Sequence, residues 1–141
     1  TGETFWEPFT KALGNQEFYK AYLKEYKGEP SYHAAAGFAA GQILERAIKE
    51  VGSIEDKKAL RDKLYSMKTI TIFGEYEVNP LGHPDSGWQI GKATNLIQWQ
   101  NAEGKKLLPN QVAIEGMVKQ IVYPKAASTA DIIYPFPGWK K

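Results

Sequence analysis

The sequence predicts an α/β fold in which helices pack on a mixed sheet. Apolar residues recur at three- and four-residue spacing through the first half of the chain, which is the period of an α-helix. The second half instead contains short runs of β-branched and aromatic residues separated by glycine, proline and asparagine, as in strands joined by turns. Helices and strands do not alternate regularly, so few strands are available to cover the apolar faces of the helices.

Three helices are expected in the first half. The first spans residues 16–26 and is followed by glycine and proline. The second spans residues 31–51, because Ser31 is suited to cap a helix N-terminus and Gly52 is suited to the position just past a C-terminus. Its first turns are rich in alanine and glycine, which permits the close approach of another backbone. A third and shorter helix fits residues 55–67.

Strands are expected in the second half. β-branched and aromatic residues predict strands over 69–73, 75–78 and 94–100, while turn residues predict a loop over 79–87 and a hairpin over 101–106.

The end of the chain is harder to assign. Residues 112–123 fit either a strand or a helix, and their last three residues, Ile-Val-Tyr, favour a strand. The tail over 134–139 contains two prolines and is expected to be extended and to lie on other protein surface.

The composition excludes several classes of function. A length of 141 residues favours one domain with its own core. The formal net charge is +2 and the lysines are scattered, without the basic stripe of a nucleic-acid-binding protein. There is no cysteine, which excludes disulfides and thiol catalysis. No apolar run reaches the length of a membrane-spanning helix, so direct membrane insertion is not expected.

The sequence predicts neither catalysis nor a cofactor. His33 and His83 are the only histidines, and no carboxylate lies at metal-ligand spacing from either of them. Glu75 and Glu77 alternate on a predicted strand and fit a solvent face better than a catalytic pair. The serines have no recognisable histidine and acid partners. No metal site and no enzymatic activity are therefore expected.

Four segments of the sequence occur in the order found in a known family. They are F-Y-K-A-Y and Y-K-G-E-P within 18–30, Y-H-A-A-A-G-F-A-A at 32–40, T-I-F-G and L-I-Q-W-Q within 71–105, and Y-P and Y-P-F-P-G-W within 123–139. The chain resembles the type I periplasmic substrate-binding proteins of ABC transporters, which bind branched-chain amino acids, amides and related small acids. The resemblance covers the last third of such a protein, so residues 1–141 are expected to be its C-terminal segment.

The resemblance implies a partial type I periplasmic-binding-protein fold. Members of that family have two α/β lobes, linked by three crossings, that close on a ligand like a clamshell. The helices here would belong mainly to the N-terminal lobe, and the final strands would return toward the hinge. Residues 106–120 depart from the family, which has a short glycine turn there, so the pairing of the last strands does not follow from the resemblance.

Tyr32, His33 and Trp6 are the candidate ligand-binding residues. The resemblance places Tyr32 or His33 just before a long helix, where family members contact the side chain of the ligand. A helix N-terminus favours an anionic group, and an aromatic ring supplies contact area at little entropy cost. The other interpretation is that Tyr32 packs within the protein and His33 is a surface residue. Trp6 would follow the third crossing and line the cleft, or it would pack in the core.

The predicted function is the substrate-binding component of an ABC importer. Its ligand would be an amino acid, an amide or a small aromatic or aliphatic carboxylate, and its partners would be the permease subunits and the missing N-terminal part of the same protein. It would be periplasmic or extracellular, with a signal peptide removed. Alone, the chain is expected to bind ligand weakly or not at all. The alternatives are a ligand-sensing domain of a signalling receptor and a self-contained interaction or carbohydrate-binding module.

Overall fold

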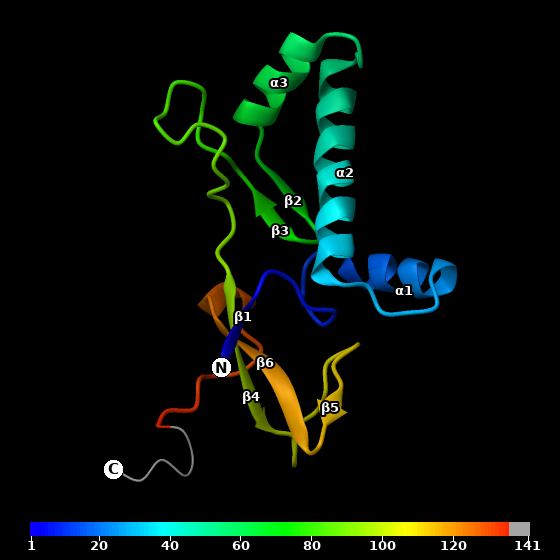
Figure 1. The fold of residues 1–141 in the computed structure, drawn as a ribbon, viewed down its shortest axis with the longest axis vertical. Helices are drawn as coiled ribbons and strands as arrows, with labels where there is room; N and C mark the ends of the chain where they lie inside the picture. The colour runs from blue at the N-terminus through cyan, green and yellow to red at the C-terminus, as the bar shows by residue number, and fades with distance from the viewer. Residues whose placement is uncertain (136–141) are drawn as a thin grey trace. The chain divides into compact units, whose positions relative to one another are not determined.

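The computed structural model of the chain describes residues 1–135, and their helices and strands divide between two compact units (Figure 1). The helical unit comprises Ala12–Ala93. The β unit comprises Thr1–Lys11 and the segment that begins at Thr94. The length of the chain favours a single domain, whereas its residues form two compact units. The helical unit is inserted in the sequence between the two parts of the β unit.

Three helices form most of the helical unit: α1 (Asn15–Glu25), α2 (Tyr32–Val51) and α3 (Lys57–Ser66). The hydroxyl of Ser31 accepts a hydrogen bond from the N–H of Ala34, and Gly52 follows α2 with a φ of 76°. The carboxylate of Asp56 caps α3 by accepting from the N–H of Ala59 at 2.9 Å. All three predicted helices are confirmed, because the residues that begin and end them act locally.

A two-stranded antiparallel hairpin completes the helical unit: β2 (Thr69–Thr71) and β3 (Gly74–Tyr76). Ile72 and Phe73 form the turn, and Gly74 begins β3 with a φ of 118°, which favours glycine. Ala47, Leu60 and Met67 are buried in a core formed by α2, α3 and the residue that follows α3. Half-buried apolar side chains surround them: Ile43, Ile48, Val51, Leu64 and Tyr76. The hairpin is thereby held against α2.

The β unit contains a four-stranded antiparallel sheet in the order β1–β4–β6–β5. The strands are β1 (Gly2–Thr4), β4 (Asn95–Asn101), β5 (Ala113–Ile114) and β6 (Met117–Tyr123), and a 3-10 turn, η1 (Lys125–Ala127), follows β6. Phe9, Ile97 and Ile121 are buried together in its core. Strand β1 was not predicted, because its three residues contain no apolar run that would indicate a strand.

The C-terminal half of the sequence is paired as strands. Residues 112–123 contain β5 and β6, so the strand interpretation is confirmed and the helical one is wrong. Glu115 and Gly116 form the tight turn between them, and both have positive φ angles, of 51° and 76°. The tail over 136–139 lies outside the described residues.

The predicted hairpin over 101–106 is wrong. A turn does close there, with the N–H of Lys105 donating to the carbonyl of Ala102 at 3.0 Å. β4 nevertheless pairs with β6 rather than with the residues directly after the turn. Pro109 lies in that segment and has no N–H for a ladder, and Asn110 has a φ of 63°. The chain therefore makes a loop before it returns as a strand.

Buried glutamines attach the C-terminal segment to the sheet. The side chain of Gln98 exchanges two hydrogen bonds with the backbone of Ile133, at 2.9 and 3.0 Å. The side-chain amide of Gln100 donates to the carbonyl of Asp131 at 2.8 Å. Gln98 and Gln100 lie two positions apart on β4, so their side chains leave the same face of the sheet. These side-chain hydrogen bonds hold the segment after η1 against one face of the sheet.

Candidate functional site

Tyr32 and His33 lie together at the beginning of α2. Their ring centroids are 3.9 Å apart, with 31° between the ring planes, and both side chains are exposed. The exposed fraction of Tyr32 is 41%. The Ser31 cap fixes the first turn of the helix and therefore the direction in which both side chains leave it. The structure thus brings two of the three predicted ligand-binding residues into one surface.

Aromatic side chains pack along α1 and between α1 and α2. Phe18, Tyr22 and Tyr26 follow one another at four-residue spacing on and just after α1, with ring centroids 5.8 and 4.5 Å apart. Phe18 also contacts Phe38 of α2, with 4.8 Å between the ring centroids. These contacts connect α1 to the helix that carries Tyr32.

A hydrogen bond fixes the loop between α1 and α2. The Tyr19 hydroxyl donates to the carboxylate of Glu29 at 2.9 Å. Burial and the neighbouring Glu29 carboxylate raise the pKa of Tyr19 above its ordinary value, so the hydroxyl keeps its proton as a donor. The segment that leads into α2 is therefore held at Glu29 by this hydrogen bond and at Ser31 by the helix cap.

Trp6 belongs to the β unit rather than to the helical unit. Only 3% of it is exposed, and its carbonyl accepts a hydrogen bond from the Thr4 hydroxyl at 2.9 Å. The ring is therefore packed inside protein in this structure, as in the core interpretation of this residue. Contact between Trp6 and a ligand stays a prediction.

A pocket of about 250 Å³ lies between α2 and the β2–β3 hairpin. Its walls are mostly apolar, with Thr71, Glu75 and Gln89 as polar members; the rest of the lining is Ala36, Ala39, Ala40, Ile43, Phe73, Gly74 and Tyr76. This pocket could not be predicted from the sequence, because its walls come from three segments that are far apart in the chain: residues 36–43, residues 71–76 and Gln89. The one available signal was the run of alanine at the start of α2.

Lys92 lies beside the hairpin turn. Its Nζ is 4.0 Å from the centroid of the Phe73 ring, and its Cδ lies 2.8 Å from the position that a Cβ on Gly74 would take. Burial lowers the pKa of the Lys92 ammonium to about 8. The attraction of the ring for a cation acts in the opposite direction, but the loss of hydration is the larger effect.

The stability of the helical unit is expected to rise with pH above pH 8 because of Lys92. Between pH 8 and pH 10.5 the unfolded chain binds a proton that the folded chain has lost, so the free energy of unfolding increases across this window. Lys92→Met should remove the rise and stabilise the chain most below pH 8. Urea unfolding at several pH values measures this.

Lys49→Met is the matched control for that measurement, because the Lys49 side chain is 72% exposed and its ammonium pairs with the exposed Glu45. Its profile should follow that of the unaltered chain. The raised pKa values of Tyr19 and Tyr76 act in the opposite direction and only near and above pH 10. A Lys92→Met profile that still rises from pH 8 would contradict the assignment.

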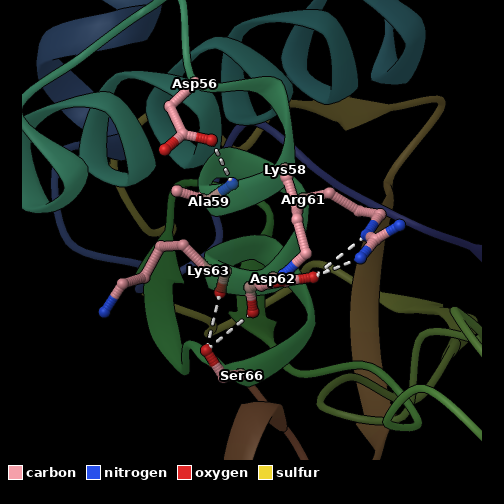
Figure 2. A network of polar contacts seen from close by, with 7 residues as sticks. All are labelled: Asp56, Lys58, Ala59, Arg61, Asp62, Lys63 and Ser66. Carbon is pink, nitrogen blue, oxygen red and sulfur yellow. Dashed lines mark hydrogen bonds and ion pairs between the residues drawn. The ribbon is translucent and has the colours of Figure 1, made fainter.

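Asp62 forms exposed ion pairs with Lys58 and Arg61 within α3 (Figure 2), while Lys63 of the same helix pairs with Glu50 of α2 at 3.2 Å. The carboxylate of Asp62 accepts from Lys58 at 2.9 Å and from Arg61 at 2.7 Å, and these hydrogen bonds lower the pKa of Asp62. The Ser66 hydroxyl donates to backbone carbonyls one turn earlier. Exposed pairs of this kind contribute little to stability, and they present no arrangement for chemistry.

The described residues form neither a metal-binding cluster nor a helix that could cross a membrane. Within residues 1–135, no three side chains of histidine, aspartate or glutamate gather in a way that could hold a metal ion. Across the described part of the chain, no helix has both the length and the apolar character that crossing a membrane requires.

Comparison with known proteins decides the family. Residues 1–102 match the profile of a protein family described as Periplasmic binding protein. The chain belongs to the periplasmic binding protein family. The resemblance found in the sequence is thus confirmed over most of the chain. A comparison with curated proteins found no match.

A solved structure shows the same partial fold. It is a solute binding protein of an ABC transporter from Rhodopseudomonas palustris BisB5, in complex with 3,4-dihydroxy benzoic acid. The TM-score is 0.54 at 17% sequence identity, and the match covers 94% of this chain and 31% of that chain. The predicted fold class, part of a periplasmic-binding-protein fold, is therefore confirmed. The chain spans about a third of the length of that protein.

The matching family comprises periplasmic binding proteins, and the solved structure is that of a solute binding protein, so neither of them is an enzyme. This agrees with the composition, which offers no catalytic arrangement. The roles of Tyr32, His33 and Trp6 in ligand contact stay predictions.

Proposed function

We propose that this chain is the C-terminal segment of the substrate-binding component of an ABC importer, which captures a small solute and delivers it to permease subunits. The family match over residues 1–102 carries this proposal. The protein would act in the periplasm or outside the cell, where members of this family meet their solutes. Its partners would be the solute, the permease and the N-terminal part of the same protein.

The proposed solute is an amino acid, an amide or a small aromatic or aliphatic carboxylate. The adjacent rings of Tyr32 and His33 offer a flat surface on which an aromatic or aliphatic group can pack. The similar solute binding protein from Rhodopseudomonas palustris BisB5 was solved with 3,4-dihydroxy benzoic acid, which is such a carboxylate. Its presence there supports the inclusion of aromatic acids in the proposed range.

The proposed mechanism is closure of two lobes on the solute. A ligand shifts such an equilibrium only through contacts that the closed state makes and the open state lacks. This chain would supply one side of those contacts at the start of α2. The chain alone is therefore expected to bind solute weakly, and the N-terminal part should restore affinity.

Loss of either ring at the start of α2 is expected to weaken solute binding. In the protein formed by this chain and its N-terminal part, Tyr32→Ala or His33→Ala should raise the Kd about tenfold or more, which corresponds to about 1.4 kcal/mol. Calorimetric titration with 3,4-dihydroxybenzoate, benzoate and branched-chain amino acids measures this.

Tyr26→Ala and His83→Ala are the matched controls for this titration. Tyr26 is exposed at the other end of the same loop, and His83 lies in an exposed loop where its Nδ1 accepts from the N–H of Asp85. Neither control should change the Kd. Equal losses in all four variants would show a general structural effect, and no binding of any solute by the unaltered protein would refute the proposed function.

A further inference from the structure

The segment from Thr129 to Ile133, named here the C-terminal strap, is attached to the β unit at every second residue. Its residues belong to no helix or strand. The first attachment is Thr129, whose N–H donates to the carbonyl of Ile121 at 2.8 Å and whose hydroxyl accepts from the N–H of Ile121 at 2.9 Å. The backbone groups of Asp131 and Ile133 supply the other two attachments. Contacts at alternate residues are typical of an extended chain beside a sheet.

Two glutamine side chains of β4 make the second and third attachments. Oε1 of Gln98 accepts from the N–H of Ile133 at 2.9 Å, and Nε2 of Gln98 donates to the carbonyl of Ile133 at 3.0 Å. Nε2 of Gln100 donates to the carbonyl of Asp131 at 2.8 Å and to Oε1 of Gln98 at 2.9 Å. The amide of Gln98 thus forms both hydrogen bonds that a neighbouring strand would form with a residue of the strap.

The end of the strap covers little apolar surface. Asp131, Ile132 and Ile133 are all exposed, and the exposed fractions of the two isoleucines are 53% and 39%. Ala127, which precedes the strap, packs against the core of the β unit. The Asp131 carboxylate pairs with Lys125, but these two side chains are 89% and 85% exposed, so the pair contributes little. Hydrogen bonds rather than apolar contacts therefore hold the end of the strap.

Release of the strap would expose mainly polar groups. Gln98 and Gln100 are 5% and 2% exposed, and water can replace the backbone groups of the strap as partners of their amides. Exchange of a hydrogen bond within the protein for one with water changes the free energy only modestly. The pairing of β4 with β6 uses no residue of the strap. The sheet can therefore stay intact while the strap leaves it.

We propose that the C-terminal strap opens and closes on the folded β unit, with Thr129 as its fixed end and with Gln98 and Gln100 as the side chains that hold it closed. Opening beyond Thr129 breaks three hydrogen bonds between the strap and these glutamines. It uncovers two amides that recognise backbone groups rather than side chains. This inference goes beyond the proposed function, because the motion requires neither a solute nor a permease.

Amide hydrogen exchange, followed by NMR for single residues of the chain, tests the proposed opening. The N–H of Ile133 should exchange at least about 100-fold faster than the most protected amides of the β4–β6 ladder, yet more slowly than in an unfolded peptide. Low concentrations of urea should not change its rate, because opening exposes little new surface. The ladder amides should exchange faster as urea is added.

Three results of this measurement would overturn the proposal. One rate and one urea dependence for Ile133 and the ladder would show that the strap is an integral part of the sheet. An Ile133 N–H without protection would show that no closed state exists in solution. A rate that falls as the chain concentration rises would show that the strap pairs between two copies instead of within one.

Gln98→Met tests the side chain that holds the strap. This change removes both hydrogen bonds to Ile133 and should speed the exchange of the Ile133 N–H about tenfold or more, while the ladder amides stay unchanged. Gln42→Met is the matched control, because Oε1 of Gln42 accepts from the N–H of Ile72 at 3.1 Å in the helical unit. Equal effects of the two variants on Ile133 would contradict the role of Gln98. The urea dependence of the unaltered chain decides the proposal even if Gln98→Met does not fold.

Discussion

Ile121→Ala is expected to lower the free energy of unfolding by about 3–4 kcal/mol. Ile121 on β6 is fully buried, and it packs with Phe9 and Ile97 at the centre of the β unit. Truncation removes three methyl or methylene groups and leaves a cavity that antiparallel strands on both sides cannot readily fill. Urea unfolding followed by tryptophan fluorescence measures the loss.

Ile114→Ala is the control for that measurement. Ile114 is the same residue type on β5 of the same sheet, but 56% of it is exposed. Its truncation should change the free energy of unfolding by no more than about 0.5 kcal/mol. Similar losses for Ile114→Ala and Ile121→Ala would show that burial at Ile121 does not support the β unit.

Lys119→Met is expected to cost about 3 kcal/mol of stability. The Lys119 ammonium donates to both carboxylate oxygens of Glu7, at 2.9 and 3.1 Å, and the Glu7 side chain is only 9% exposed. Methionine keeps most of the volume of lysine but removes the charge. The effect arises because the Glu7 carboxylate is then left buried without a partner, and thermal or urea unfolding measures it.

Two further variants separate that cause from a general loss of packing. Lys49→Met breaks the Lys49–Glu45 pair, whose side chains are well exposed, and should cost less than about 1 kcal/mol. The double variant Glu7→Gln with Lys119→Met removes both charges and should be more stable than Lys119→Met alone. If the double variant is no better, the lone carboxylate is not the source of the loss.

The features predicted best from the sequence are those encoded by neighbouring residues. The ends of α2 follow from Ser31 and Gly52, which act within one turn of the helix. β1 and the partner of β4 could not be found in this way. β1 is recognised as a strand only by its pairing with β4, around Ile97. β4 in turn pairs with β6, which follows it only after the loop that contains Pro109.

The candidate site shows the same division. The resemblance places Tyr32 and His33 at the start of a long helix, and the structure has them there as adjacent rings. The pocket behind α2 and the environment of Lys92 could not be predicted. Both depend on where the hairpin brings Phe73 and Gly74, which is a matter of tertiary packing. The spacing of residues along the sequence does not reveal such tertiary contacts.

The pairing of β1 with β4 also has a consequence for the order in which the chain folds. Gly2 lies opposite Ile97, and the whole helical unit separates them in the sequence. Closing so long a loop costs conformational entropy, whereas the contacts of α2, α3 and the hairpin are comparatively local and form faster. The helical unit can therefore assemble while the first strand is still unattached. Strand β1 would then be the last strand to pair in the sheet, although it precedes the helical unit in the sequence.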